Sequence, residues 1–292
     1  MTATAAPFGP VPTPAPGRVL VDGARVATLS IADRGLHYGD GLFETIAIRD
    51  GLPCLWQAHL TRLRLGAGRL AIPMPDPDLL LAECLDLSRG IEAGVVKLIL
   101  TRGRGGRGYR PPREPVPTRI LALYPDPTPP PGTREGGVAV RWCRTTLGEN
   151  PQLAGIKHLN RLEQVLARAE WDDDAQAEGL MRDCHGRVIA GTMTNLFVYT
   201  GGRLLTPRLD GCGVAGTVRA LTMDLGPRLG IGVAEAELRP ADLGAADGLF
   251  LTNAVIGVWP VRSLGDWGFD VGRLPQSLMA ALGTAVHAPD IP

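Results

Sequence analysis

The chain has 292 residues, of which 45% are hydrophobic and 21% are charged, so it is long enough for one large or two medium domains with a buried core. Its 30 basic and 30 acidic residues cancel, which argues against a general nucleic-acid binder or a membrane-surface binder, because both need a basic excess. No apolar run approaches the roughly 20 residues that a membrane span requires.

Residues 1–17 are rich in alanine, proline and threonine, with no basic segment and no apolar run, so we expect a disordered tail and not a secretory signal. The five cysteines are widely spaced and form no C-x-x-C pair, which indicates free thiols in a reducing cytoplasm. The five histidines show no metal-ligand spacing either, so we expect no metal site.

Residues 18–124 alternate strand and helix patterns and form the first predicted domain. Strands are expected over residues 18–29 (a hairpin turned at Asp22-Gly23), 42–48, 52–56, 95–101 and 119–123. Helices are expected where apolar residues recur at helical spacing, over residues 57–70 and 78–89. A stiff, proline-rich linker, residues 125–132, then marks the domain boundary.

The second predicted domain, residues 133–292, mixes short strands with helices. Its strands are expected over residues 137–142, 179–183, 187–189, 195–199, 231–238 and 248–251. Its helices are expected over residues 160–170, from about residue 216, and over 276–286. Mixed strands and helices in two lobes indicate an α/β or α+β fold.

Lysine is unusually rare, since only Lys97 and Lys157 occur against 28 arginines (30 basic residues minus 2). The chain therefore uses arginine nearly everywhere that a positive charge suffices. A retained lysine is a candidate for chemistry that a guanidinium cannot perform, because an amine loses its proton, attacks a carbonyl and forms a Schiff base. A base-composition bias explains Lys97 about equally well, whereas Lys157 lies in a distinctive segment just before a helical pattern.

Two glycine-punctuated loops are candidate ligand-binding segments. Residues 33–45 run into a strand and carry Tyr38 and Phe43. The arginine-glycine loop, residues 102–110, combines four arginines with glycines and Tyr109. Because arginine binds carboxylate or phosphate through paired hydrogen bonds, this loop fits a clamp for a substrate with more than one carboxylate. A short RNA-binding segment and a solvated charged loop are the alternatives.

Two further segments offer backbone amides to a phosphate. Residues 213–219 are glycine-rich and lead into a helix, whose first amides lack intrahelical partners. Residues 251–254 follow a strand, and Arg62 on the first predicted helix adds a charge. Neither segment matches the Walker pattern, since neither contains a lysine. Together with Lys157 they indicate a phosphate-bearing aldehyde cofactor fixed to a lysine, for which pyridoxal phosphate is the candidate.

Residues 33–45, 102–109, 150–165 and 191–197 resemble aminodeoxychorismate lyases, which belong to the class IV aminotransferase family of pyridoxal-phosphate enzymes. The resemblance runs from about residue 18 to the end of the chain. It implies a two-domain, D-amino-acid aminotransferase-like fold, with a small N-terminal α/β domain and a larger C-terminal pseudo-barrel domain. Residues 150–165 match the lyases specifically, whereas residues 191–197 are shared with branched-chain and D-amino-acid aminotransferases.

The same resemblance implies residue roles. Lys157 forms the aldimine with pyridoxal 5'-phosphate and then acts as the acid and base. The other cofactor-binding residues are Arg62, through its side chain, and Thr217, Val218, Asn253 and Ala254, through their backbone amides. The substrate-binding residues are Tyr38, Phe43, Lys97, Arg107 and Tyr109.

The implied substrate is 4-amino-4-deoxychorismate, and the implied products are 4-aminobenzoate, a folate precursor, and pyruvate. Lys157 removes the proton from the carbon that bears nitrogen, the cofactor takes up the electrons and the enolpyruvyl ether leaves. One position departs from the family, because Ala190 stands where the family has a glutamate that pairs with the pyridine nitrogen. Loss of such a charge-assisted hydrogen bond costs about 1.5–3 kcal/mol, so we expect reduced but real activity.

An aminotransferase acting on D- or branched-chain amino acids is the alternative within the same fold. A catalytically silent, cofactor-binding protein is the alternative of another class, and Ala190 is the feature that favours it. The segments 102–110 and 150–165 favour the lyase. We expect a cytoplasmic homodimer with no nucleic-acid or membrane partner, and the dimer rests on analogy with the family.

Overall fold

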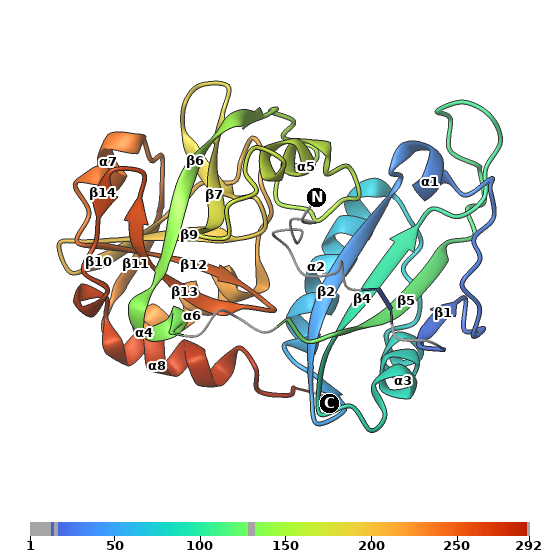
Figure 1. Cartoon of the computed structure of the whole chain (residues 1–292). Coiled ribbons are helices and arrows are strands. Elements are labelled where there is room, and N and C mark those ends of the chain that lie inside the picture. Colours follow the sequence, from blue (N-terminus) through green and yellow to red (C-terminus); the bar gives the residue numbers. More distant parts are fainter. Residues whose placement is uncertain (1–12, 15–16, 128–131, 291–292) are drawn as a thin grey trace, which may run out of the picture. The chain divides into compact units, whose positions relative to one another are not determined.

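The computed structural model describes residues 13–14, 17–127 and 132–290 (Figure 1). Most of the predicted tail and residues 128–131 of the predicted linker lie outside the described residues. The chain divides into an N-terminal unit (Pro14–Thr128, Gln152–Arg161 and Gly283–Pro292) and a C-terminal unit (Met1–Thr13, Pro129–Pro151 and Leu162–Leu282). The segment that carries Lys157 therefore folds with the N-terminal sheet, although the sequence analysis assigned it to the second domain.

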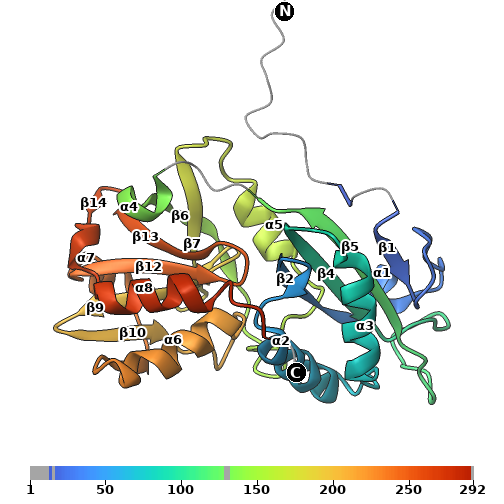
Figure 2. The same ribbon diagram turned by 90° about the horizontal axis from the view of Figure 1, so that it is seen from below.

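The N-terminal unit is built on a five-stranded antiparallel sheet in the order β1-β5-β4-β2-β3 (Figure 1). Its strands are β1 (Val19–Val21), β2 (Gly41–Arg49), β3 (Leu52–Pro53), β4 (Ala93–Thr101) and β5 (Thr118–Pro125). Its helices are α1 (Arg34–Tyr38), α2 (Trp56–Leu70) and α3 (Pro77–Ser88), which Figure 2 shows from below.

Alternation along the strands decides which face of this sheet is covered. Ile46 of β2 and Leu98 of β4 point into a core that also contains Leu60 of α2 and Leu80 of α3. The alternate residues of the two strands lie on the other face, among them Phe43 of β2, with Ile99 opposite it, and Lys97 of β4. The sheet thus buries one face against the two helices and presents Phe43 and Lys97 on its other face.

The predicted hairpin over residues 18–29 is wrong, although its turn forms. Asp22 and Gly23 adopt φ values of 50° and 83°, and Val21 makes an isolated bridge with Ala24. No strand returns from this turn, because β1 pairs with β5 instead. The strand expected over 52–56 shortens to β3, since α2 begins at Trp56.

Helix α1 lies inside the segment that the sequence analysis took as a loop. Asp33 Oδ1 accepts a hydrogen bond from Gly35 N at 2.8 Å and so caps the helix, and Gly39 ends it in the left-handed region at φ 62°. The helices expected over 57–70 and 78–89 and the strands expected over 42–48, 95–101 and 119–123 are confirmed with boundaries shifted by one or two residues.

The C-terminal unit contains a nine-stranded sheet in the order β11-β10-β9-β12-β13-β6-β7-β8, with β14 paired to β13. Its strands are β6 (Val138–Leu147), β7 (Gln176–Asp183), β8 (Val188–Gly191), β9 (Asn195–Thr200), β10 (Arg203–Pro207), β11 (Gly232–Ala236), β12 (Gly248–Asn253), β13 (Gly257–Leu264) and β14 (Trp267–Gly268). Its helical elements are α4 (Thr133–Gly136), α5 (Leu162–Arg168), α6 (Thr217–Arg228), α7 (Pro240–Gly244), the short η1 (Val271–Arg273) and α8 (Gln276–Ala285), whose last residues belong to the N-terminal unit.

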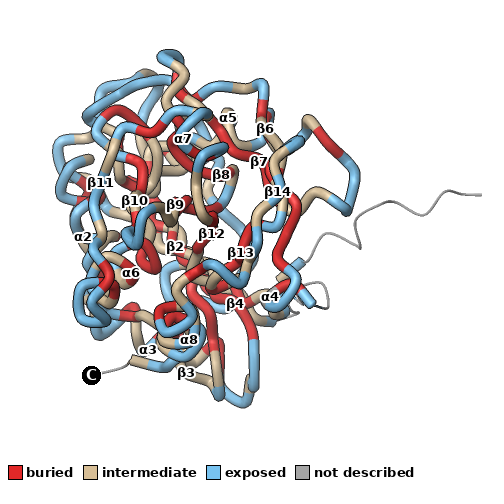
Figure 3. The backbone as a smooth tube through the Cα atoms, turned by 90° about the vertical axis from the view of Figure 1, so that its left-hand side faces the viewer, coloured by how far each residue is buried: buried red, intermediate tan, exposed pale blue. Residues whose placement is uncertain are grey.

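This sheet curls into the expected pseudo-barrel. Strands β8 and β9 stand far apart in the strand order, yet only residues 192–194 connect them. Because the four peptide links from Gly191 to Asn195 span at most about 14 Å, the sheet must bend until the two strands approach. Strands β9 and β12 are buried over most of their length (Figure 3), and Phe197 stacks on Phe250 with ring centroids 5.0 Å apart.

The sequence analysis missed α4, β10, α7, β13, β14 and η1 in this unit, whereas the other elements are confirmed with shifted boundaries. Helix α5 is shorter than expected, and its apolar residues Leu162, Val165 and Leu166 are exposed. All five cysteines are free thiols, and among the described residues no helix is long and apolar enough to cross a membrane.

Candidate functional site

The backbone of Lys157 is held by β2. Phe43 N donates a hydrogen bond to Lys157 O at 3.0 Å, and Leu159 N donates to Gly41 O at 3.0 Å. Strand β3 pairs only with Ile48 and Arg49, at the C-terminal end of β2. Residues 157–159 pair with the N-terminal end of β2. These hydrogen bonds to β2 therefore fix the backbone position of Lys157.

The Lys157 amine lies among residues that the sequence analysis selected separately. Its Nζ is 4.3 Å from the centre of the Phe43 ring, and Lys97 Nζ is 5.4 Å from the same ring. Burial, followed by the charge of Arg62, lowers the pKa of the Lys157 amine to about 7. A large fraction of this amine is therefore neutral near neutral pH and able to act as a nucleophile or a base.

We expect acylation of Lys157 by acetic anhydride in the cofactor-free chain to rise with a midpoint near pH 7, because only the neutral amine reacts. Peptide mapping after brief labelling at each pH measures it. In Glu44→Gln the midpoint should fall, since the Glu44 carboxylate raises the pKa of Lys157. A midpoint near the ordinary lysine value of about 10.4 would contradict the environment described for this amine.

Arg62 is held by Glu44, a residue that the sequence analysis missed. Arg62 Nε donates to Glu44 Oε1 at 2.8 Å, its Nη2 pairs with Oε2, and His59 Nδ1 lies 2.6 Å from Oε2. Burial alone raises the pKa of Glu44, but Arg62 and His59 outweigh it and hold the pKa at about 2. Burial lowers the pKa of His59. A glutamate on the buried face of an apolar strand was the available signal, because a buried carboxylate needs a cation.

Tyr38 and Tyr109 meet where α1 contacts the arginine-glycine loop. Their ring centroids are 5.4 Å apart, and Gly108 N donates to the Tyr38 hydroxyl at 3.1 Å. Arg34, which the sequence analysis did not select, donates from Nη1 to Gly108 O at 3.0 Å and from Nη2 to Tyr109 O at 2.9 Å. The side chains of Arg107 and Tyr109 are exposed, so the loop presents them to solvent while Arg34 holds its backbone.

Arg102 does not belong to the clamp that the four arginines suggested. Its Nε and Nη2 donate to the Asp40 carboxylate at 2.8 and 3.0 Å. The same guanidinium donates to Ala71 O at 2.9 Å and to Leu70 O at 2.8 Å. Arg102 is therefore buried as the anchor of the loop, and its donors are taken up by two backbone carbonyls and by the Asp40 carboxylate, which it shares with Arg34.

In the C-terminal unit, Thr217 and Val218 begin α6, as expected. Gly216 is the N-cap and supplies no side-chain cap, so the first amides of the helix lack that partner. A Cβ added at Gly216 would lie 2.0 Å from Asn195 Oδ1, which explains the glycine at this position. Thr217 Oγ1 is buried and has no hydrogen-bond partner among the described residues. An uncapped helix start beside an unpartnered hydroxyl is suited to an anion such as phosphate.

Asn253 is the last residue of β12, which packs against α6, and Ala254 follows it. Asn253 Oδ1 accepts hydrogen bonds from Val255 N at 2.8 Å and Ile256 N at 2.9 Å, so its side chain shapes the turn. This geometry is compatible with a ligand contact through the backbone and not through the amide side chain. Thr252 Oγ1, which the sequence analysis did not select, is another buried hydroxyl without a partner in the part of the chain that the structure describes.

Ala190 lies in an apolar cluster and pairs in register with Met181. The Glu178 carboxylate lies near Ala190 but on the side of the neighbouring Gly191. Its Oε2 would be 2.7 Å from a Cβ added at Gly191. Successive strand residues point to opposite faces, so Glu178 lies on the face away from Ala190. It is fully used there, accepting hydrogen bonds from the amides and hydroxyls of residues 192–194.

Each unit, taken by itself, holds groups that suit a part of pyridoxal phosphate. The N-terminal unit supplies an amine with a pKa of about 7 and the guanidinium of Arg62. The C-terminal unit supplies the start of α6 and the buried hydroxyls of Thr217 and Thr252. The one departure is Ala190, where no side chain accepts a hydrogen bond.

Comparisons with known proteins agree with this chemistry. The family described as amino-transferase class IV matches residues 41–264. An aminodeoxychorismate lyase of Vibrio harveyi is 34% identical over 268 residues, covering 90% of this chain and 99% of that protein. The crystal structure of 4-amino-4-deoxychorismate lyase from Pseudomonas aeruginosa superposes with a TM-score of 0.88 at 48% identity, covering 92% of this chain and 100% of that one. A putative branched-chain-amino-acid aminotransferase of Methanocaldococcus jannaschii is 31% identical, with coverages of 80% and 82%.

Proposed function

Because this chain belongs to the class IV aminotransferase family, we propose that it is a pyridoxal-phosphate-dependent lyase that converts 4-amino-4-deoxychorismate into 4-aminobenzoate and pyruvate. The observation that carries the proposal is the Lys157 amine, which has a pKa of about 7 and lies 4.3 Å from the Phe43 ring. The lyases among the relatives favour this reaction over amino transfer within the same family.

The reaction breaks one C–O bond and makes an aromatic ring. Pyridoxal phosphate, when bound, supplies an aldehyde that accepts an amine and a conjugated ring that takes up electrons. Lys157 Nζ would hold the cofactor, and the same amine, once free, would take the proton from the carbon that bears the substrate amine. The enolpyruvyl ether leaves from the neighbouring carbon, and a proton returned to its methylene carbon gives pyruvate.

The remaining proposed roles follow from charge and position. Arg62, oriented by Glu44, binds the phosphate, as do the backbone amides of Thr217, Val218, Asn253 and Ala254. Lys97 and Arg107 supply positive charge for the two substrate carboxylates. Tyr38, Phe43 and Tyr109 supply flat apolar surface for the substrate ring.

We extend the proposal to a cytoplasmic homodimer. Three neighbouring apolar residues of α5, Leu162, Val165 and Leu166, are 76%, 60% and 61% exposed, and such a face is typical of a surface that another chain covers. Free cysteines agree with a reducing compartment. Sedimentation velocity at micromolar concentration should give the mass of two chains, and a monomer would contradict the dimer.

Product analysis tests the proposed reaction. Purified protein given 4-amino-4-deoxychorismate should release 4-aminobenzoate and pyruvate in equal amounts, followed by ring fluorescence and a coupled lactate dehydrogenase assay. Parallel reactions should show slower or no transfer of amino groups from D-alanine or leucine to 2-oxoglutarate. Dominant transfer would support an aminotransferase, and a yellow protein that turns over neither substrate would support a silent binding protein.

A further inference from the structure

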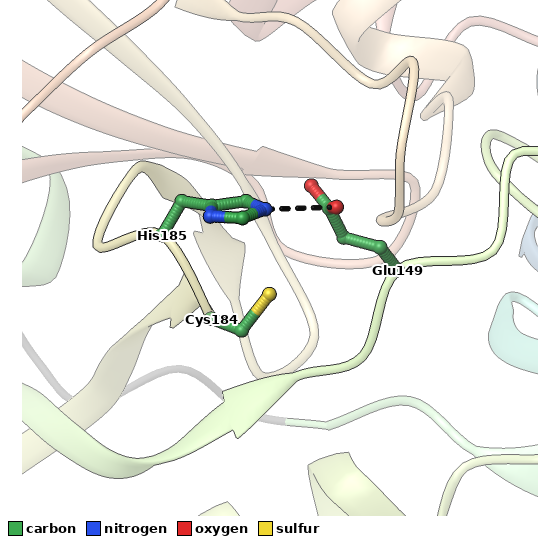
Figure 4. A group of neighbouring side chains, drawn as sticks. All are labelled: Glu149, Cys184 and His185. Carbon is green, nitrogen blue, oxygen red and sulfur yellow. Dashed lines mark hydrogen bonds and ion pairs between the residues drawn. The ribbon is translucent and has the colours of Figure 1, made fainter.

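A second cluster of reactive side chains lies in the C-terminal unit, on loops that the proposed reaction does not use. Glu149 follows β6, whereas Cys184 and His185 form the turn between β7 and β8 (Figure 4). One ligand atom from each of the three residues lies within 4.8 Å of the others. From this juxtaposition we propose that Glu149, Cys184 and His185 form a zinc-binding site on the surface of the protein.

The donor set is what selects zinc. A thiolate, an imidazole nitrogen and a carboxylate oxygen are the ligand types that zinc combines, whereas calcium and magnesium prefer oxygen alone. Zinc bonds of about 2.0–2.3 Å place tetrahedral ligands about 3.3–3.8 Å apart. The three ligand atoms lie within 4.8 Å of one another, so side-chain rotation alone brings them to this spacing. Water supplies the fourth ligand.

The backbone that carries Cys184 and His185 is already fixed. Asp183 Oδ1 accepts hydrogen bonds from His185 N and Arg187 N, both at 2.9 Å, and Asp183 is buried. Gly186 takes φ 77°, which a tight turn needs and other residues rarely adopt. The opposing loop is held by Asn150 N, which donates to Gly211 O at 2.8 Å. Metal binding thus orders only side chains and not a loop.

The local charge also favours a cation. Two guanidiniums face the cluster. Arg187 pairs with Glu149 and Asp183 and lies 4.0 Å from Asp210, whereas Arg239 donates to His185 O at 2.6 Å and pairs with Glu237. Four carboxylates, those of Glu149, Asp183, Asp210 and Glu237, against two guanidiniums leave a negative balance. Arg187 contacts Glu149 Oε1, so Oε2, which lies 3.2 Å from His185 Nε2, is the oxygen that would bind zinc.

A zinc titration of the full-length, cofactor-loaded protein, freed of metal with a chelator, tests the site. With a competing chromophoric chelator we expect one Zn²⁺ bound per chain with micromolar or tighter affinity. Cys184→Ser, His185→Ala and Glu149→Gln should each weaken it at least about 10-fold. Asp210→Asn, which removes a neighbouring charge but no ligand, should change it less than about threefold.

Thiol reactivity gives a second readout that locates the metal. Cys184 is the exposed cysteine and the other four are buried, so Ellman's reagent should react rapidly with one thiol per chain. Zn²⁺ should slow that reaction at least about 10-fold, and the protection should disappear in His185→Ala. Zinc bound equally well by all three ligand variants, or no protection of Cys184, would overturn the proposal whatever the enzyme's activity.

Discussion

Replacing Lys157 with alanine should lower the release of 4-aminobenzoate by at least about 10⁴-fold, the scale on which enzymes depend on a covalent catalyst. Lys157→Arg should fail as completely, although it keeps a positive charge, because guanidinium stays protonated and does not attack a carbonyl. Both variants should fold, since Phe43 N bonds to the backbone carbonyl of residue 157 and not to its side chain. Product release under saturating substrate measures the loss, and circular dichroism checks the fold.

Lys97 provides the matched control because it is the other lysine of the chain and lies beside the same aromatic ring. Borohydride reduction of the wild-type protein with its cofactor should label the peptide that contains residue 157. Lys97→Ala should keep that label and mainly raise KM, whereas Lys157→Ala should take up no label. A small primary amine added to Lys157→Ala should restore part of the activity. Turnover within tenfold of wild type in Lys157→Ala would remove the basis of the proposed function.

The elements that local sequence pattern controls were predictable, and those that depend on remote partners were not. Helix α2 and strand β4 carry clear periods of apolar residues and were found. Strand β13 was missed because a proline such as Pro260 argues against a central strand. In the structure β13 nevertheless lies between β12 and β6, and Pro260 stands opposite Phe250 of β12. The supposed hairpin partner of β1 was displaced by β5, which lies about a hundred residues further along the chain.

The candidate site divides in the same way. Rarity drew attention to Lys157, the residue pattern indicated the amides of residues 213–219 and 251–254 with Arg62, and the resemblance assigned their roles. The supporting contacts were not visible in sequence, because Glu44 holds Arg62, Arg34 holds the arginine-glycine loop and Glu178 holds residues 192–194, each across a gap in the chain. Helix α1 could have been found, since Asp33 and Gly39 are ordinary signals for the start and end of a helix. The proposed zinc ligands were not selected from the sequence, because Glu149 comes from a different loop than Cys184 and His185.

Ala190→Glu should raise turnover by about one to two decades, because the added carboxylate would accept a charge-assisted hydrogen bond from the ring nitrogen of the cofactor. The structure makes this test sharper than the sequence alone. Ala190 lies in an apolar cluster opposite Met181, and Glu178 cannot take over because it faces residues 192–194. Initial rates with saturating 4-amino-4-deoxychorismate measure the gain, and Ala190→Gln, equal in size but uncharged, should give little of it.

Thermal unfolding with and without cofactor separates this electrostatic effect from packing. Without cofactor, a glutamate among Cys143, Leu147 and Met181 lacks a partner and should lower the free energy of unfolding by about 1–3 kcal/mol. Bound cofactor should recover that loss in Ala190→Glu but not in Ala190→Gln, because a ligand stabilises the folded state in proportion to the logarithm of its affinity. If neither turnover nor cofactor-linked stability improves in Ala190→Glu, the missing carboxylate does not limit this protein, and aromatisation of the product drives the reaction without it.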